Sequence, residues 1–418
     1  MVGALLVSAL AATVALACLR GPRSQSLAQI IAAAPIELRC AVRNLADNGV
    51  RNRMLVTLNL AAVDRGFPRL EWWDYTNQGL EAELTLVGGQ STKDWTDKET
   101  LDAMAHSLKA PKVTAFSPEP SRIRLEVRTS DVLAAPATLP VAVPDDVDLR
   151  AVRIGITEAG SPWLLAILWT HLLIVGATGS GKGGVLWAIL HGLGPAIRSG
   201  LVDVWCVDPK GGVEFGPGKE LFVRFAYKTA EDVLALLTEA VAVMRERQAA
   251  LFAAGIRKHV PTVAEPLIVI IIDEAASLTA YASRKIREEF EELHGLLLSQ
   301  GRALGISLIG CVQDPSKDTM PQRQLYPLRI GLRLDEPSQM NMVFGAGARD
   351  RGARCDEIPD TTPGVAFVEQ DGSTSITRAR AFLVTDDDVQ DIVGRYAPVP
   401  SPIAINPHTT DSGQEVAA

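Results

Sequence analysis

Residues 171–187 read HLLIVGATGSGKGGVLW, an apolar run, a glycine-rich loop with one lysine, and a second apolar run. This order predicts a buried strand from Leu172 to Val175, then a loop, then a helix from about Gly183. The loop fits the G-x-x-x-x-G-K pattern, in which inward-facing backbone N–H groups and the lysine bind nucleotide phosphates. We therefore predict a phosphate-binding loop formed by Gly176, Ala177, Thr178, Gly179, Ser180, Gly181 and Lys182.

The position after the lysine departs from the usual pattern. Serine or threonine normally stands there and offers a hydroxyl to Mg²⁺, whereas this chain has Gly183. Gly183 is still expected to contact the nucleotide. The alternative interpretations are an ordinary glycine-rich turn and a weak dinucleotide-binding loop, and a second motif downstream argues against both.

That second motif is the acid-tipped run LIVIIIDE at residues 267–274. A parallel sheet carries ligands at the carboxyl edge of its strands, which is where this run delivers its two acids. Asp273 is then placed to hold Mg²⁺, and Glu274 to polarise the attacking water. An accidental strand end with two acids is the alternative. We expect the two motifs to lie side by side on one sheet with ATP and Mg²⁺ as cofactors.

A third polar position, Gln313, ends the apolar run that begins at Ile306. An amide can donate to a phosphate oxygen and accept from water, so Gln313 is a candidate γ-phosphate sensor; a polar strand end explains it equally well.

The stretch from Arg302 to Cys355 contains eight basic residues and five acidic ones, and this excess of positive charge suggests either phosphate contacts or a solvated face. We predict that Arg302 and Arg329 act as arginine fingers towards a neighbouring subunit.

Composition limits the class of protein. The chain has 418 residues, 47% of them apolar and 22% charged, which is typical of a globular protein of two or three domains. The net charge of −8 argues against a histone-like protein, although a local basic stripe is compatible with it. The five cysteines show no C-x-x-C spacing and are expected to be reduced thiols.

The first 19 residues carry no charge, and Arg20 and Arg23 follow them. As a helix of about 1.5 Å per residue they would span about 28 Å, close to the hydrocarbon core of a bilayer. A cleaved signal peptide or a soluble amphipathic end is the alternative. The arginines after the apolar run predict a single-pass protein of the cell membrane with the ATPase in the cytoplasm.

Further along, near-continuous Val, Ile and Leu strands alternate with helices, which indicates a parallel sheet covered on both faces. The predicted fold class is α/β, with a mostly parallel sheet preceded by a small α+β domain and the transmembrane helix. The domains are expected to be an anchor at 1–20, a helical linker region at 21–80, the α+β domain at 81–135, a proline-rich linker at 136–149, the nucleotide-binding domain at 150–396 and a flexible tail at 397–418.

Taken together, the motifs resemble the FtsK/SpoIIIE family of DNA translocases, in particular its plasmid-transfer branch of TraB-like proteins. The resemblance covers roughly residues 81–385. It rests on the blocks HLLIVGATGSGKGG, WCVDPKGGVEFGPG, LIVIIIDEAA, GRALGISLIGCVQDPSKDTMPQ and YPLRIGLRLDE.

The resemblance implies a hexameric RecA-like P-loop motor that hydrolyses ATP and pulls double-stranded DNA through its channel while tethered to the cytoplasmic membrane. It implies that Asp208 and Lys210, in the DPKGG block, lie near the nucleotide. An ATP-binding scaffold with weak hydrolysis, favoured by Gly183, and a coupling ATPase for single-stranded DNA secretion are the competing hypotheses. Chromosome segregation is an alternative to conjugative plasmid transfer as the setting.

Overall fold

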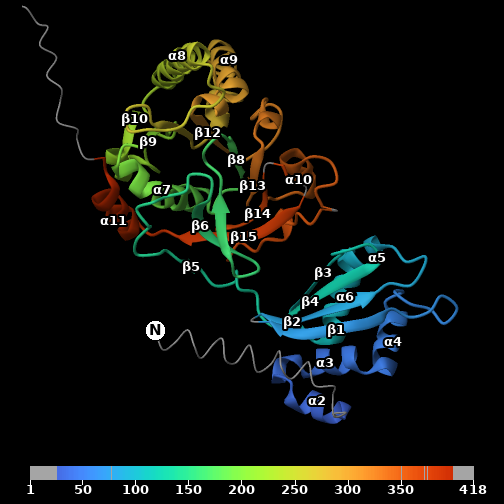
Figure 1. Cartoon of the computed structure of the whole chain (residues 1–418). Helices are drawn as coiled ribbons and strands as arrows, with labels where there is room; N and C mark the ends of the chain where they lie inside the picture. Colours follow the sequence, from blue (N-terminus) through green and yellow to red (C-terminus); the bar gives the residue numbers. More distant parts are fainter. Residues whose placement is uncertain (1–25, 77, 350, 371, 374, 399–418) are drawn as a thin grey trace, which may run out of the picture. The chain divides into compact units, whose positions relative to one another are not determined.

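The computed structural model describes residues 26–76, 78–349, 351–370, 372–373 and 375–398 (Figure 1). Its contacts divide the chain into an N-terminal unit up to Val132 and a C-terminal unit from Leu133, and each is described by itself. The expected membrane anchor at residues 1–20 lies outside the described residues. Within the described part of the chain, no helix combines the length and the apolar character that crossing a membrane requires.

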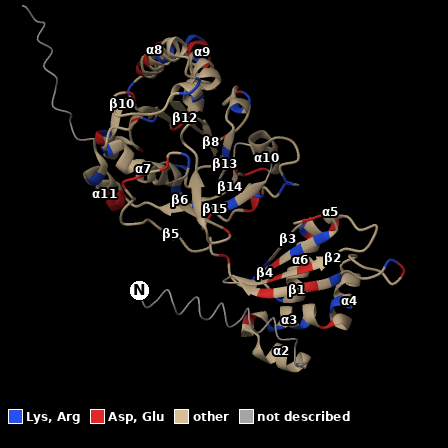
Figure 2. Cartoon of the chain, in the orientation of Figure 1, with Lys and Arg blue, Asp and Glu red and all other residues tan. Residues whose placement is uncertain are grey.

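The N-terminal unit is an antiparallel sheet of strand order β1-β2-β4-β3, accompanied by helices. Its elements are α2 (Leu27–Ala33), α3 (Arg39–Ala46), α4 (Asn48–Thr57), β1 (Arg69–Thr76), β2 (Gly79–Thr85), α5 (Thr92–Thr96), α6 (Lys98–Leu108), β3 (Lys112–Phe116) and β4 (Arg122–Arg128). Alternate side chains of β4 are buried, as expected for a strand with one covered face. Figure 2 shows charges of both signs along this sheet.

The structure draws the boundary near residue 80 differently from the sequence prediction. One apolar core runs from Ala34 to Val127 and includes side chains of α3, α4 and the sheet, so the helices belong to the same unit as the strands. The apolar face of the sheet needs a cover, and these helices provide it. The side chain of Asp47 caps α4, and that of Asp97 caps α6.

The C-terminal unit is built on one large sheet of strand order β10-β9-β11-β12-β8-β13-β14-β15-β6-β7 (Figure 1). The first six strands in this order pair in parallel, and the last four continue the sheet in antiparallel fashion. The bounds are β6 (Val152–Thr157), β7 (Pro162–Leu165), β8 (Leu172–Val175), β9 (Val202–Val207), β10 (Phe222–Ala226), β11 (Leu267–Ile272), β12 (Ile306–Val312), β13 (Leu328–Gly331), β14 (Val365–Glu369) and β15 (Ile376–Leu383).

The parallel half matches the predicted sheet, and every residue of β8, β11 and β12 is buried, which explains their unbroken aliphatic sequences. The predicted proline-rich linker at 136–149 instead packs on the C-terminal unit. Within it, β5 (Ala137–Thr138) pairs with β15, and the amide of Val143 donates to the hydroxyl of Tyr396.

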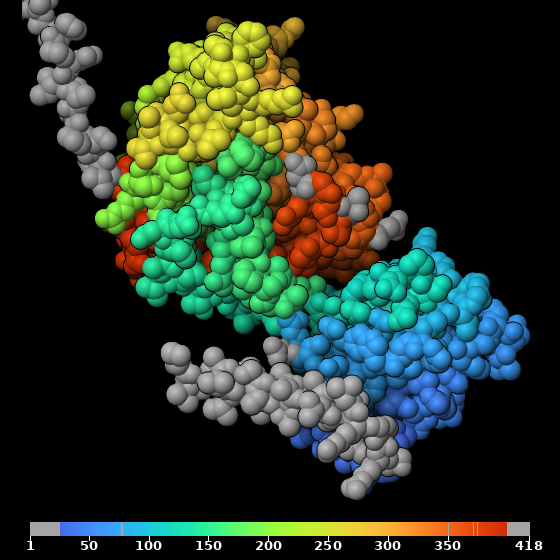
Figure 3. All heavy atoms as spheres, viewed as in Figure 1, coloured from blue at the N-terminus to red at the C-terminus, as the bar shows by residue number. Residues whose placement is uncertain are grey.

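Among its described residues, this unit has five α-helices: α7 (Lys182–Arg198), α8 (Ala230–Ala254), α9 (Arg284–Gln300), α10 (Pro337–Phe344) and α11 (Asp386–Tyr396). Helix α7 is buried along most of its length and contributes to the main core. Helices α8 and α9 lie side by side and begin at the N-caps Thr229 and Ser283. The chain around the end of α8 (yellow in Figure 3) exposes apolar side chains, with Phe252 at 89%.

Candidate nucleotide-binding site

The phosphate loop joins β8 to α7 and is held by the backbone of the two strands beside β8. The amide of Gly176 donates to Val312 O at 3.2 Å, and the amide of Ala177 donates to Arg333 O at 2.8 Å. Gly181 has φ +97°, and a β-carbon there would stand 2.4 Å from Gly364 N. Only glycine fits this turn, so the loop conformation is built into the sheet.

Lys182 is the first residue of α7, and its side chain folds back over the loop that precedes it. Its Nζ donates to Gly176 O at 2.6 Å, and the residue is only 9% exposed. Burial lowers the pKa of Lys182, and the carboxylates of Glu274 and Asp273 oppose that shift. The charged amine therefore lies inside the loop, where the pattern G-x-x-x-x-G-K requires it.

Strand β12 stands between β8 and β11, so the lysine loop and the acid-tipped strand share one edge of the sheet without being neighbours. Val175 pairs with Val312, and Ile272 pairs with Gly310. The expectation that the two motifs lie side by side is corrected to this extent. Because β12 lies next to β8, Gln313, which follows β12, reaches the phosphate loop. Its Oε1 accepts a hydrogen bond from the hydroxyl of Thr178 at 2.9 Å.

Asp273 directly follows β11 and is 3% exposed. Its Oδ2 accepts a hydrogen bond from Lys210 Nζ at 2.8 Å, so the two residues form an ion pair. Burial alone would lower the pKa of Lys210, but the hydrogen bond to Asp273 and the nearby carboxylates outweigh it and raise the pKa. A cation is thus already held against Asp273 at the carboxyl edge of the sheet.

Glu274 is 5% exposed, and neither of its carboxylate oxygens has a hydrogen-bond partner among the described residues. Burial raises the pKa of Glu274, while the charges of Lys182 and Lys210 and the amide of Ala276 act in the opposite direction. A buried carboxylate without a partner is costly to the fold. Such a group is typical of a functional site that binds a ligand or activates a reactant.

Asp208 is fully buried and shapes the loop after β9. It accepts from the amides of Lys210, Glu214 and Phe215, each at 3.1 Å. The Asp208 carboxylate therefore accepts hydrogen bonds from backbone amides of the loop that follows its own strand. Asp208 positions Lys210 next to Asp273.

The two arginine-finger candidates lie away from the phosphate loop of their own chain. Arg302 is exposed and belongs to the turn before β12, so it stands at the end of that strand opposite to Gln313. Arg329 lies in β13, and its guanidinium donates to Tyr326 O and to Val343 O, each at 2.9 Å. These two bonds would have to break before Arg329 could reach another subunit. Both assignments stay predictions.

Much of the local positive charge between residues 302 and 355 is neutralised inside the fold. Arg349 pairs with Asp356 and Glu357, and Arg351 pairs with Glu369. This arrangement favours the solvated, internally paired alternative for these arginines over a contact with nucleic acid.

Two residues at this edge were not identified as functional from the sequence. Arg333 follows β13, and its Nη2 donates to Thr178 O in the phosphate loop at 2.8 Å. Glu214 lies in the loop after β9, with its carboxylate next to Gly183. The parallel pairing of β13 with β8 could have suggested Arg333, because the ends of neighbouring parallel strands meet at one edge.

The residues of the described chain include no group of three or more His, Cys, Asp or Glu side chains that could hold a metal ion alone. Mg²⁺ usually takes only one or two carboxylates and completes its shell with phosphate oxygens and water. The buried Asp273 and the unpartnered Glu274 therefore fit an Mg²⁺ that arrives with a nucleotide.

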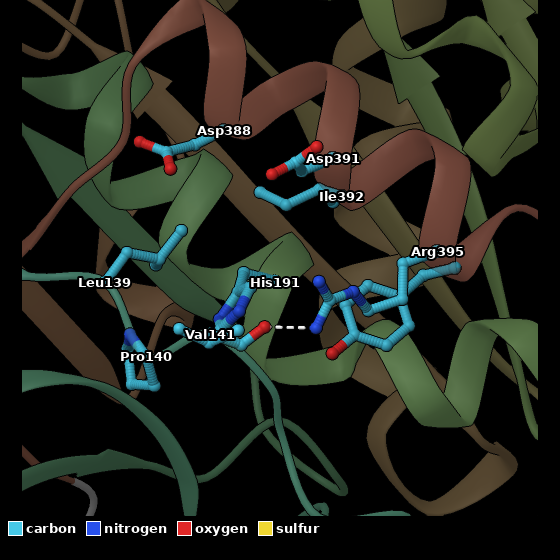
Figure 4. A pocket seen from close by; sticks show the side chains of 9 residues that line it. Leu139, Pro140, Val141, His191, Asp388, Asp391, Ile392 and Arg395 are labelled. Atoms are coloured by element: carbon cyan, nitrogen blue, oxygen red, sulfur yellow. Dashed lines mark hydrogen bonds between the residues drawn. The ribbon is translucent and has the colours of Figure 1, made fainter.

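A small cavity of about 120 Å³ lies between α7, α11 and the segment 139–141 (Figure 4). Its lining includes His191 of α7, and Arg395 of α11 donates to Val141 O beside it. At this cavity, α11 contacts the segment 139–141, which belongs to the predicted linker 136–149. No residue of the phosphate loop lines the cavity.

Comparison with known proteins agrees with this geometry. The model of the FtsK/SpoIIIE family matches residues 127–264, which include the phosphate loop and the DPKGG block. This part of the chain is therefore similar to the FtsK/SpoIIIE family. The similarity is to a family of P-loop ATPases that includes DNA translocases.

Two family relatives illustrate the extent of the similarity. The chain is 29% identical to the transfer protein TraSA of Streptomyces ambofaciens over 363 residues, which cover 81% of this chain and 84% of that protein. It is 24% identical to the DNA translocase FtsK of Staphylococcus epidermidis over 318 residues, or 69% of this chain but only 38% of that protein.

Among solved structures, the fold is similar to that of the pCW3 conjugation coupling protein TcpA, determined in a monomer form with ATPγS. The TM-score is 0.52 at 20% identity, and the match covers 82% of this chain and 97% of that one. This likeness concerns the fold alone.

Proposed function

We propose that this protein is an ATP-driven translocase of double-stranded DNA that serves conjugative plasmid transfer. The single observation that carries the proposal is that Lys182, Asp273, Glu274 and Gln313 meet at one edge of the sheet, where Glu274 is buried without a partner. A buried carboxylate kept unpaired beside a phosphate loop has a clear use in hydrolysis.

In this proposal the residues have separate tasks. The loop amides and Lys182 bind the phosphates, and Asp273 holds Mg²⁺, which neutralises charge on the phosphate oxygens when bound. Glu274 orients and polarises the attacking water. Gln313, already bonded to Thr178 of the loop, reports the presence of the γ-phosphate to β12 and the elements that follow it.

The choice of transfer as the setting is supported by the relative that matches most of its own length, a protein named for transfer. The FtsK relatives are matched over little more than a third of theirs, so chromosome segregation is the less supported setting. We also propose a hexamer tethered to the cell membrane through residues 1–20, with the ATPase in the cytoplasm. Exposed apolar side chains such as Phe252 and Tyr281 are available for subunit contacts.

Two further candidates remain as outcomes of the test. A coupling ATPase for single-stranded DNA is suggested by the likeness in fold to a conjugation coupling protein. A scaffold with weak hydrolysis is suggested by the glycine at position 183, where a hydroxyl is usual.

The test is ATP turnover of the purified full chain, measured without DNA, with linear duplex DNA and with single-stranded DNA. Turnover should rise at least several-fold with duplex DNA, and the variant Lys182→Ala should lose it by about 10²-fold or more because the phosphate charge is no longer countered. Lys219→Ala is the matched control, since this exposed lysine lies outside the phosphate loop.

Stimulation by single-stranded DNA alone would favour the coupling function. Turnover that is slow and indifferent to any DNA would favour the scaffold. Turnover that survives in Lys182→Ala would remove the proposed nucleotide site altogether.

A further inference from the structure

The side chain of Glu214 fills the space beside Gly183, the loop position that lacks a hydroxyl. A β-carbon built on Gly183 would stand 1.9 Å from Glu214 Oε1 and 2.8 Å from Glu214 Cδ. A carboxylate oxygen therefore already lies close to where serine or threonine would place its hydroxyl at this step of the phosphate loop. The residue usual in the motif and the side chain of Glu214 compete for one position.

Glu214 is held at this place by buried neighbours. Its amide and that of Phe215 both donate to Asp208 Oδ2, at 3.1 Å each. Phe215 is fully buried and stacks on Trp187 of α7, with ring centroids 5.4 Å apart. The loop after β9 is thus fixed against the helix that follows the phosphate loop, and a surface side chain is aimed at the start of that helix.

The surroundings of the Glu214 carboxylate lack a balancing cation of their own. Among the described residues it forms no hydrogen bond or ion pair with another side chain, and the charges of Asp273 and Lys210 both act on it. Lys210 is already bonded to Asp273. Beside them, Glu274 is 95% buried with both oxygens unpartnered. Three carboxylates therefore lie at this edge of the sheet, where the ammonium groups are those of Lys210, bonded to Asp273, and Lys182, bonded to Gly176 O.

We propose that Glu214 supplies the cation-binding oxygen that the phosphate loop lacks at Gly183, so that Mg²⁺ bound with ATP is held by Glu214 together with Asp273. The inference rests on the proposed function, because it requires a nucleotide in this loop. A carboxylate is a suitable substitute, since Mg²⁺ binds one or two carboxylates alongside phosphate oxygens. The inference also predicts that a hydroxyl at position 183 can replace the carboxylate at position 214 as a ligand of Mg²⁺.

The experiment measures binding of ATPγS by calorimetry to the full chain, in Mg²⁺ and in EDTA. Four variants are compared with the unchanged chain: Glu214→Gln, Glu214→Ala, the double variant Gly183→Ser with Glu214→Ala, and the control Glu220→Gln. Glu220 is an exposed acid six residues away with a long contact to Lys219 only. Thermal unfolding of each variant verifies that it is folded.

The expected result is that Glu214→Gln and Glu214→Ala weaken binding in Mg²⁺ at least tenfold while changing it less than twofold in EDTA. The double variant should regain most of the Mg²⁺ dependence through the new hydroxyl, and Glu220→Gln should behave as the unchanged chain. Rescue by serine is the readout that a packing role of Glu214 would not produce.

The inference is overturned if Glu214→Gln keeps the full Mg²⁺ dependence, or if binding falls equally in Mg²⁺ and in EDTA. In those cases the unchanged chain still binds ATPγS and the proposed function stands. If the unchanged chain binds no ATPγS in either condition, the proposed function fails first and this inference falls with it.

Discussion

Glu83 of the N-terminal unit and Glu274 of the C-terminal unit are both buried in or beside a sheet, but their carboxylates have opposite surroundings. Glu83 in β2 of the N-terminal unit is 3% exposed and accepts hydrogen bonds from Arg122 and from Arg124, the latter at 2.7 Å. Glu274 after β11 of the C-terminal unit is 5% exposed and has no hydrogen-bond partner among the described residues.

In the proposed function, Glu83 is a structural carboxylate and Glu274 is a functional one. Glu83 lies opposite Arg124 in the antiparallel register, so the sheet itself supplies the countercharge. Glu274 stands at the carboxyl edge of parallel strands, where the charges of Lys182 and Lys210 act on it but no described residue forms a hydrogen bond with its oxygens, and where ligands of such sheets bind. We expect substitutions to separate the two: changes at Glu274 should affect turnover, and changes at Glu83 should affect stability.

The largest effect is expected for Glu274→Gln. Turnover should fall by about 10²–10⁴-fold, because the amide cannot polarise water as a carboxylate does. ATPγS binding should stay within about threefold of the unchanged chain, because the loop and Lys182 remain. Steady-state turnover and calorimetry measure the two quantities. Glu83→Gln is the matched control, and similar losses of turnover in both variants would erase the contrast.

A smaller loss is expected for Gln313→Ala. Removing the amide deletes its hydrogen bond with Thr178 in the loop, and a single hydrogen bond of this kind corresponds to about tenfold in rate. Turnover measured at saturating ATP should fall by about that factor, with thermal stability unchanged, since Gln313 is exposed. A variant as active as the unchanged chain would show that β12 carries no sensor.

For Glu83→Gln, the effect should be on folding alone. The N-terminal unit should lose about 1–2 kcal/mol of unfolding free energy, a modest value because Arg122 and Arg124 keep 42% and 31% of their side chains exposed. Hydrogen exchange of peptides covering β2 and β4 measures it. Turnover should stay within twofold, and unchanged exchange rates would mean that the arginine pair does not stabilise the sheet.

The two glutamates should also respond to pH in opposite directions. Arg124 and Arg122 hold the pKa of Glu83 below its ordinary value of 4.5, so its stabilising effect is present above that value and is lost as the pH falls through the lower, folded pKa. Burial raises the pKa of Glu274 above 4.5, so its ionised form costs stability as the pH rises through the raised pKa.

This pH dependence is measurable in turnover. The proposed function requires ionised Glu274, whose pKa burial raises, so the acid limb of the turnover profile should lie above pH 4.5. It should disappear from the residual activity of Glu274→Gln. If the acid limb is unchanged in this variant, it arises from the titration of a group other than Glu274.

The parallel half of the large sheet and the phosphate loop could be predicted from the sequence, because aliphatic runs buried on both faces and a fixed loop pattern leave strong local signals. Strand β15 of the antiparallel half could not. Strand β15 reads ITRARAFL, in which arginines at 378 and 380 interrupt the apolar pattern. Arg380 is nonetheless buried, since it donates to backbone carbonyls of residues 133 and 134.

Candidate site residues on one strand or loop could be identified from spacing, whereas contacts across strands could not. The sequence placed Asp273 and Lys182 at one edge but could not reveal that β12 separates them. Nor could it indicate that Glu214, 31 positions after Gly183, occupies the space of the missing side chain. Both facts depend on strand order, which local patterns do not encode.

The most direct measurement is an experimental structure of the full chain with ATPγS and Mg²⁺. The account predicts a triphosphate enclosed by residues 176–182, with Lys182 Nζ transferred from Gly176 O to a phosphate oxygen and Asp273 on the side of the metal. A nucleotide bound elsewhere, or a loop in which Lys182 still contacts Gly176 O with the nucleotide present, would contradict it.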